Sequence, residues 1–175
     1  GSDTGGSVRA PASLCGTVGL KTTVGRVSRY GVFPLSWTMD SVGPLTRSVE
    51  DAALVYQVMQ GEDLNDDSTI GVVTHDVMPG LKSGVKGLRV GVPRDAFFDD
   101  LDPEVEKAIA VCVRVFKDLG AHVENIAYPE ARIAQAIRGS ISNVEGCVFH
   151  AERVRARVDD MDPVVGPRML GDMDR

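Results

Sequence analysis

The chain has 175 residues, of which 43% are hydrophobic and 25% are charged, and its formal net charge is −6. This length and composition are typical of a soluble globular protein of ordinary single-domain size. The acidic balance argues against a nucleic-acid partner or an acidic membrane surface, and no apolar run is long enough to span a bilayer.

Residues 1–47 are rich in Gly, Ser, Thr and Pro, a composition typical of loops that shape a pocket. The segment opens with the string GSDTGGSVRAPA over residues 1–12. A short helical turn is predicted over residues 11–15, just before Gly16. A helix that begins there would add its dipole to backbone amides that stabilise an anion.

A longer helix is predicted to begin at Ser48. This residue has the hydroxyl of an N-cap, and the acidic Asp51 follows three positions later, as in a capping box. Apolar residues then recur on one helical face until Gly61 ends the pattern. The acidic residues 62–69 are predicted to form a loop, and because they lack the ligand spacing of a calcium site, no metal is predicted there.

A β-α-β unit is predicted in the second half of the chain. Residues 88–93 and 121–126 have the patterns of short strands. Between them, Asp102 and Pro103 have the residue types of a helix cap and a first helical position. Two strands joined in this way are expected to pair in parallel. Residues from about 130 to 158 are predicted to be helical, and the tail after them has no clear pattern and is expected to fray.

The three cysteines, Cys15, Cys112 and Cys147, are widely spaced and form no CxxC motif. An odd number of cysteines without a disulfide framework indicates a reducing compartment, so a cytoplasmic location is predicted. Each cysteine is expected to be a small buried hydrophobic residue.

Ser7 is the candidate catalytic residue because Gly5 and Gly6 precede it. Glycines allow backbone conformations that turn several consecutive N–H groups toward one small site. Such donors can hold the charge that forms when an activated serine attacks an amide or ester carbonyl. Taken alone, a Gly-Gly-Ser string is more often a tight turn than an active site.

The longer string changes this interpretation. Residues 1–44 closely resemble the signature segment of the amidase signature family of serine hydrolases, and residues 47–53 continue the match. A weaker resemblance in the pattern of elements extends to about residue 130. The resemblance implies an α/β fold in which a mixed β-sheet is covered by helices on both sides.

The resemblance also predicts how the chain is organised. Residues 1–175 would form a single partial amidase-like domain. Its parts would be a nucleophile and oxyanion region at 1–47, a helix and a β-α-β unit at 48–130, and a helical tail at 131–175. Because truncation would expose strand edges and apolar surface, marginal stability or association is expected in isolation.

Roles for individual residues follow from the same resemblance. Ser7 would be the nucleophile that becomes acylated. Asp3 and Arg9 would support its loop from behind without taking part in the chemistry. No cofactor or metal is implied. The oxyanion hole would be formed by the backbone N–H groups of Thr4, Gly5, Gly6 and Ser7.

The family's base is not found in this sequence. In the family, a lysine acts through a second serine held on a cis peptide bond, and both precede the nucleophile. Only six residues precede Ser7, so both groups are expected upstream of this chain, and the chain alone is expected to be inactive. Two weaker alternatives are Lys21 as a substitute base and a Ser–His pair with one of His75, His122 and His150.

The leading hypothesis is hydrolysis of a carbon–nitrogen amide bond in a small molecule through a serine acyl-enzyme. One alternative is the glutaminase subunit of a tRNA-dependent amidotransferase, which residues 26–31 and 66–69 also resemble. Against it, Trp37 stands where that subunit usually has small residues, and residues 140–155 lack a Tyr-Asp-Gly pattern. Another alternative is a non-catalytic fragment or binding module. No membrane partner is expected, a nucleic-acid partner is expected only for the amidotransferase, and association into a homo-oligomer stays open.

Overall fold

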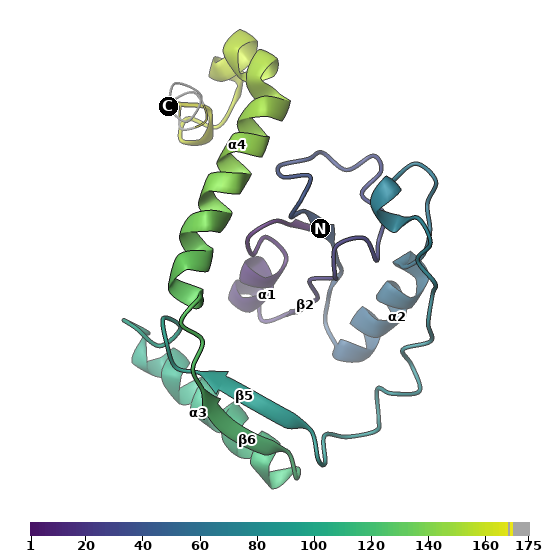
Figure 1. Ribbon diagram of the computed structural model, residues 1–175, viewed down its shortest axis with the longest axis vertical. Coiled ribbons are helices and arrows are strands. Elements are labelled where there is room, and N and C mark those ends of the chain that lie inside the picture. The colour runs from purple at the N-terminus through teal and green to yellow at the C-terminus, as the bar shows by residue number, and fades with distance from the viewer. Residues whose placement is uncertain (168, 170–175) are drawn as a thin grey trace. The chain divides into compact units, whose positions relative to one another are not determined.

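The computed structural model describes residues 1–167 and residue 169 (Figure 1). Its helices and short strands form a mixed α/β structure, the class predicted from the sequence. The described strands pair as three two-stranded sheets, two antiparallel and one parallel. The chain divides into two compact units, Gly1–Leu81 with Arg138–Arg175, and Lys82–Ile137.

Two antiparallel strand pairs frame the first unit. Asp3 lies opposite Ser41, so one of these pairs anchors the start of the loop that carries Ser7. Next to it, the Gly43 N–H donates to the Gly1 carbonyl at 2.9 Å. A Cβ at Gly43 would lie 1.8 Å from the carbonyl oxygen of Leu20, so only glycine fits at this crossing. The pairs are β1 (Ser2–Asp3) with β3 (Ser41–Val42), and β2 (Val18–Gly19) with β4 (Leu45–Thr46).

The first two helices confirm the predictions from capping residues. α1 (Arg9–Cys15) begins two residues before the predicted turn and ends at Gly16, whose φ of 63° is left-handed. α2 (Val49–Met59) begins after Ser48, whose Oγ accepts a hydrogen bond from the Asp51 amide at 3.0 Å. Local sequence therefore determines where both helices begin and end.

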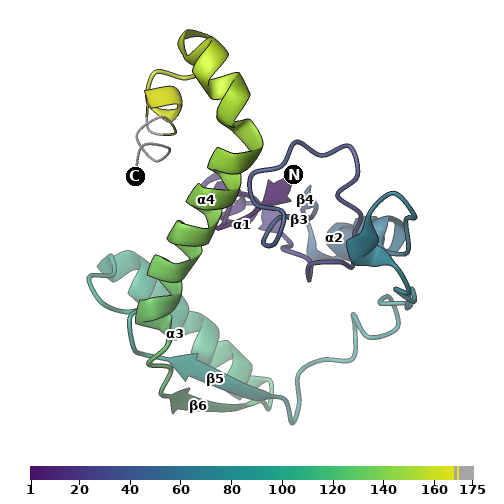
Figure 2. The ribbon, with the colours of Figure 1, turned by 45° about the horizontal axis from the view of Figure 1, so that its top comes forward.

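The helix predicted from about residue 130 is confirmed as α4 (Ala131–Arg157), and both ribbon views show it as one continuous helix (Figures 1 and 2). α4 begins in the second unit and continues into the first. Two short 3-10 helices, η1 (Asp67–Thr69) and η2 (Val158–Asp160), complete the first unit. Part of the tail expected to fray, residues 168 and 170–175, lies outside the described residues. The buried residues of α4 are Ser142, Glu145, Gly146, His150 and Val154.

The second unit contains the predicted β-α-β arrangement. β5 (Arg89–Pro93) and β6 (His122–Ile126) pair in parallel, with Arg89 opposite His122. α3 (Pro103–Asp118) connects them, and its N-cap Asp102 accepts a hydrogen bond from the Glu104 amide at 2.7 Å. The parallel pairing confirms the sequence prediction for this segment.

The hydrophobic core is small in the described part of the chain. Larger apolar side chains remain open to solvent, among them Leu14, which is 89% exposed. The expectation of buried cysteines is wrong: Cys15 and Cys112 are exposed, and Cys147 is half-buried. Cys112 lies on α3, which buries none of its residues. No described helix has both the length and the apolarity needed to cross a membrane. The buried hydrophobic residues are Val8, Ala12, Val27, Ala52, Val92, Ala121 and Val154.

Candidate active site

The loop between β1 and α1 is built around the carboxylate of Asp3, which is completely buried. Its Oδ1 accepts hydrogen bonds from the Gly6 amide at 2.8 Å and from Arg9 Nη2 at 3.1 Å. Its Oδ2 accepts from the Val8 amide at 3.1 Å, and from the amide and Nε of Arg9 at 3.4 and 3.1 Å. One buried carboxylate thus fixes the backbone on both sides of Ser7.

Asp3 stays ionised because its hydrogen bonds outweigh its burial. Burial by itself would raise the pKa of this carboxyl group. The hydrogen bond from the Arg9 side chain, those from the Val8 and Gly6 amides, and the Arg9 charge together hold the pKa well below its usual range. The Arg9–Asp3 ion pair therefore persists at neutral pH.

Ser7 lies at the surface end of this loop. Gly6 precedes it with a φ of 140°, a conformation that a residue with a Cβ rarely adopts. Ser7 itself is exposed, whereas Val8 directly behind it is completely buried. The loop therefore presents the serine hydroxyl to a pocket of about 550 Å³. That pocket is lined by Thr4, Gly5, Gly6, Ser7, Ala10, Pro11, Leu35, Arg138 and Ser142.

The backbone amides of the loop divide into two groups. The Gly6 N–H, which the sequence assigned to the oxyanion hole, donates to Asp3 and is already used. Within residues 1–167 and 169, no acceptor is found for the amides of Thr4, Gly5 and Ser7. The donors open to a ligand at the pocket are therefore drawn from these three residues.

Asp40 connects this loop to a second one, residues 33–38. Its Oδ1 accepts a hydrogen bond from Thr4 Oγ1. Its Oδ2 accepts the amides of Leu35 and Ser36 at 2.8 and 2.9 Å. Because Leu35 lines the Ser7 pocket, Asp40 fixes one wall of the pocket relative to the loop that carries the serine.

Glu145, on α4, holds the same second loop from the other side. This carboxylate is 7% exposed and accepts hydrogen bonds from Ser36 Oγ, from Thr38 Oγ1 at 2.8 Å and from the Thr38 amide at 3.2 Å. Burial would raise its pKa, but the bonds from Ser36 and Thr38 lower it overall. Sequence reasoning missed Glu145, because it lies among the mixed charges of a helix and carries no motif.

Lys21 serves the frame of the site rather than the serine. Its Nζ donates to the Asp3 carbonyl at 2.8 Å, to Ser41 Oγ at 2.8 Å and to the Met39 carbonyl at 3.4 Å. These bonds cross-link β1 and β3 beneath the loop. They give Lys21 a structural explanation that does not involve accepting a proton from Ser7.

The two histidines of the first unit have other partners as well. His150 Nε2 lies 2.7 Å from the Pro34 carbonyl, and its ring stacks on Phe33 at 4.7 Å. The amide of His75 donates to Gln60 Oε1 at 3.3 Å. Among the described contacts, neither imidazole reaches Ser7, so the Ser–His alternative gains no support.

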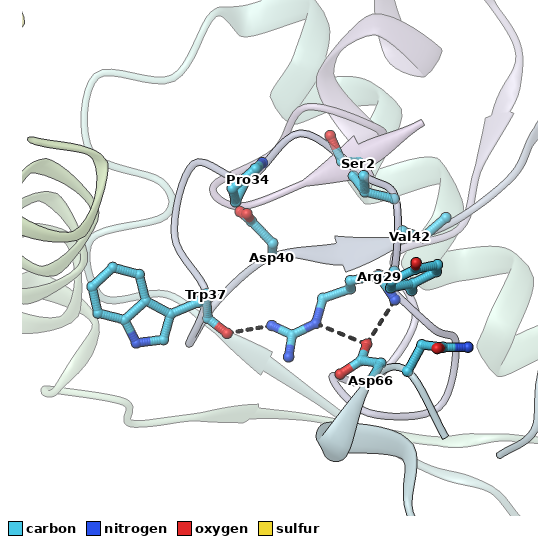
Figure 3. Close-up of a pocket in the computed structure, with 10 residues that line it drawn as sticks. Ser2, Arg29, Pro34, Trp37, Asp40, Val42 and Asp66 are labelled. Carbon is cyan, nitrogen blue, oxygen red and sulfur yellow. Dashed lines mark hydrogen bonds and ion pairs between the residues drawn. The ribbon is translucent and has the colours of Figure 1, made fainter. Parts of the chain in front are cut away.

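A second pocket of about 190 Å³ lies in the same unit, between Arg29 and Trp37 (Figure 3). Arg29 donates its amide to Asp66 Oδ2 at 2.7 Å and its Nη1 to the Trp37 carbonyl. Burial would raise the pKa of Asp66, but hydrogen bonds from Arg29 and Ser68 outweigh it and lower the pKa to about 2. The acidic loop at 62–69 thus uses Asp66 to bind Arg29.

Comparison with known proteins agrees with this geometry. The family model described as Amidase matches residues 1–168. An amidase of Pseudomonas putida is 46% identical over 156 residues, which cover 89% of this chain and 34% of that protein. A subunit of the glutamyl-tRNA(Gln) amidotransferase of Geobacter sp. (strain M21) is 43% identical over 145 residues, covering 83% and 30%. The chain thus spans about a third of the length of these relatives.

Solved structures share the fold. An s-triazine catabolic enzyme, described in a vestigial protein complex, aligns with a TM-score of 0.92 at 37% identity, covering all of this chain and 37% of that one. A subunit of the glutamyl-tRNA(Gln) amidotransferase of Thermotoga maritima aligns with a TM-score of 0.80 at 36% identity, covering 90% and 36%. The peptide amidase of Stenotrophomonas maltophilia aligns with a TM-score of 0.77 at 28% identity, covering 99% and 40%. The chain therefore belongs to the amidase family, as the resemblance of its first residues implied.

Proposed function

We propose that this chain supplies the nucleophile and the oxyanion donors of an amidase that hydrolyses a carbon–nitrogen amide bond in a small molecule. The observation that carries the proposal is the exposed Ser7 at a pocket, beside backbone amides that no described group occupies. Asp3 and Arg9 hold the loop rigid from behind, and this preorganises the donors.

The proposed reaction begins when Ser7 Oγ attacks the amide carbonyl and forms a carbon–oxygen bond. The carbonyl oxygen becomes negative and is held by amides from Thr4, Gly5 and Ser7. The tetrahedral intermediate then expels ammonia or an amine, which takes up a proton as it leaves. Water attacks the resulting ester, releases the acid and restores the serine.

The proton of Ser7 must pass to a base. The resemblance to the amidase signature family points to a lysine and a bridging serine that precede the nucleophile, and we propose that residues outside 1–175 supply them. Since the contacts of Lys21 explain it structurally, residues 1–175 alone are expected to hydrolyse amides several orders of magnitude more slowly than the complete enzyme.

Covalent labelling tests the assignment. The full-length protein that carries this chain is treated with a serine-directed phosphonate, and the modified peptide is identified by mass spectrometry. Modification is expected at Ser7 and is expected to disappear in Ser7→Ala. Ser13→Ala is the matched control, because Ser13 is an exposed serine of α1 outside the pocket lining. Unchanged labelling of Ser7→Ala would refute the assignment.

The glutaminase subunit of a tRNA-dependent amidotransferase remains the alternative, because several relatives are subunits of glutamyl-tRNA(Gln) amidotransferases. The large side chain of Trp37, which is 47% exposed beside the second pocket, favours a stand-alone amidase. Glutamine hydrolysis that requires charged tRNA and a partner subunit would reverse this preference. A non-catalytic binding module would be indicated if neither hydrolysis nor labelling of Ser7 occurred.

We also propose that the protein works in the cytoplasm. Cys15, Cys112 and Cys147 form no disulfide in the described chain, which fits a reducing compartment. The test is the location of the full-length protein in fractionated cells. Recovery from a secreted fraction would contradict the proposal.

A further inference from the structure

We propose that Arg138 makes the Ser7 pocket selective for amides that carry a carboxylate a few bonds from the scissile carbonyl. This inference rests on the proposed function, because it concerns the substrate of the same site. It also extends that function, because it assigns a binding group that the first residues of the chain do not reveal.

The position of Arg138 depends on the missing side chain of Gly5. A Cβ built on Gly5 would lie 2.6 Å from Arg138 Nη1 and 3.2 Å from its Cζ. The guanidinium group therefore lies directly against the loop that presents Ser7. Both residues line the same pocket, Ser7 from the β1–α1 loop and Arg138 from α4.

The charge of Arg138 is not neutralised within the described part of the chain. Arg9, the other cation close to the loop, is paired with the buried Asp3 at 3.1 Å. For Arg138, no ion pair with an acidic residue is found among residues 1–167 and 169. All the other residues that line the pocket have neutral side chains. The pocket beside the serine thus carries one net positive charge.

A positive charge in this setting selects for an anionic ligand. The guanidinium group is planar and always charged, and its paired N–H groups match the two oxygens of a carboxylate. Arg138 is half-buried, so a carboxylate bound to it is only partly screened by water. Ala10, Pro11 and Leu35 leave little else in the pocket to bind a polar substituent. A neutral amide of the same size would leave this cation without a partner.

Four amides test the preference in the full-length protein. Succinamate carries its carboxylate on the acyl side, and N-acetylglycine carries it on the leaving-group side. Their neutral counterparts are 4-methylpentanamide and N-isobutylacetamide, in which an isopropyl group replaces the carboxylate. The kcat/KM of at least one anionic amide is expected to exceed that of its neutral counterpart by about 10- to 100-fold, the range of a charge-assisted hydrogen bond. Which pair shows the difference identifies the side on which the carboxylate lies.

Variants connect the preference to Arg138. Arg138→Gln is expected to remove most of the preference while leaving turnover of the neutral amides within about twofold. Arg138→Lys keeps the charge without the paired N–H groups, so an intermediate preference is expected. Arg155→Gln removes the same charge from an exposed position of the same helix and is expected to change neither class. Equal loss for anionic and neutral amides in Arg138→Gln would overturn the proposal, as would a wild-type protein without any preference.

A binding measurement separates this inference from the proposed function. Calorimetry with Ser7→Ala protein measures succinamate and N-acetylglycine affinity without any chemistry. Weaker binding of these ligands after Arg138→Gln is added supports the carboxylate site, even if Ser7 is not labelled by phosphonates. If Ser7 is labelled but Arg138→Gln changes no affinity, the carboxylate site is wrong and the amidase assignment stands.

Discussion

Thr4 and Asp40 join the two loops that form the Ser7 pocket: Thr4 Oγ1 donates to Asp40 Oδ1, and the other oxygen of Asp40 accepts the amides of Leu35 and Ser36. Thr4 belongs to the loop that carries Ser7. Leu35 belongs to the opposite wall of the pocket. A single carboxylate therefore determines how far the wall lies from the serine.

Thr4→Val is expected to weaken this connection. Valine has the shape of threonine but leaves Asp40 Oδ1 without its donor, at a cost of about 1–3 kcal/mol in the free energy of unfolding. Urea unfolding of the full-length protein measures the change, and phosphonate labelling of Ser7 should slow with it. Thr46→Val is the control, because the Thr46 hydroxyl makes its bond of 2.8 Å at the surface. Equal stability of the two variants would contradict the role given to Thr4.

Asp66 predicts a specific response to acid. Its pKa is about 2 in the folded chain, against an ordinary value of 3.8. A lowered folded pKa stabilises the protein fully above the unfolded pKa, and this contribution is lost as the pH falls from about 4 to about 2. The contribution at neutral pH is roughly 2 kcal/mol. Asp66→Asn should therefore be less stable at pH 7, and its stability should depend less on pH between 4 and 2. A parallel pH profile for the two proteins would count against this role.

Two glycines of α4 should respond oppositely to alanine. A Cβ at Gly146 would lie 3.2 Å from Leu35 Cδ1 and 3.4 Å from the Leu35 carbonyl oxygen, so Gly146→Ala must push Leu35 toward the pocket. The expected loss of stability is about 1–3 kcal/mol, with slower labelling of Ser7. A Cβ at Gly139 meets no atom within 4 Å, so Gly139→Ala should stabilise the helix by about 0.5–1 kcal/mol. Thermal unfolding of both variants distinguishes the two effects, and a stabilising Gly146→Ala would refute the tight contact.

Residues 1–175 in isolation are expected to be marginally stable or to associate. The described core contains small side chains, while Val58 is 85% exposed and Leu64 is 80% exposed. Exposed apolar surface of this kind favours self-association. Analytical ultracentrifugation and calorimetry test this expectation. A monomer with one cooperative unfolding transition would contradict it.

The local parts of this structure could be predicted from the sequence. Ser48 and Asp102 cap helices through bonds to residues two or three positions away, so neighbouring residues are sufficient to locate them. The β-α-β unit followed from the order of its patterns. The string around Ser7 likewise identified the family, because the loop and the buried Asp3 that supports it lie within nine residues.

The walls of the pocket could not be predicted in this way. Ser36 and Glu145 are 109 residues apart in the chain, and no periodic pattern relates them. Arg138 and Gly5 come together only because α4 packs against a loop that lacks a side chain at one position.

The sequence by itself determined the family, the loop that carries the candidate nucleophile and the ends of most helices, because those features depend on contacts between near neighbours. Only the tertiary structure decided that the Gly6 amide belongs to Asp3, that Lys21 serves the frame and that a cation lies beside Ser7. These outcomes depend on which distant side chains reach one buried or half-buried point, and that choice is made by packing.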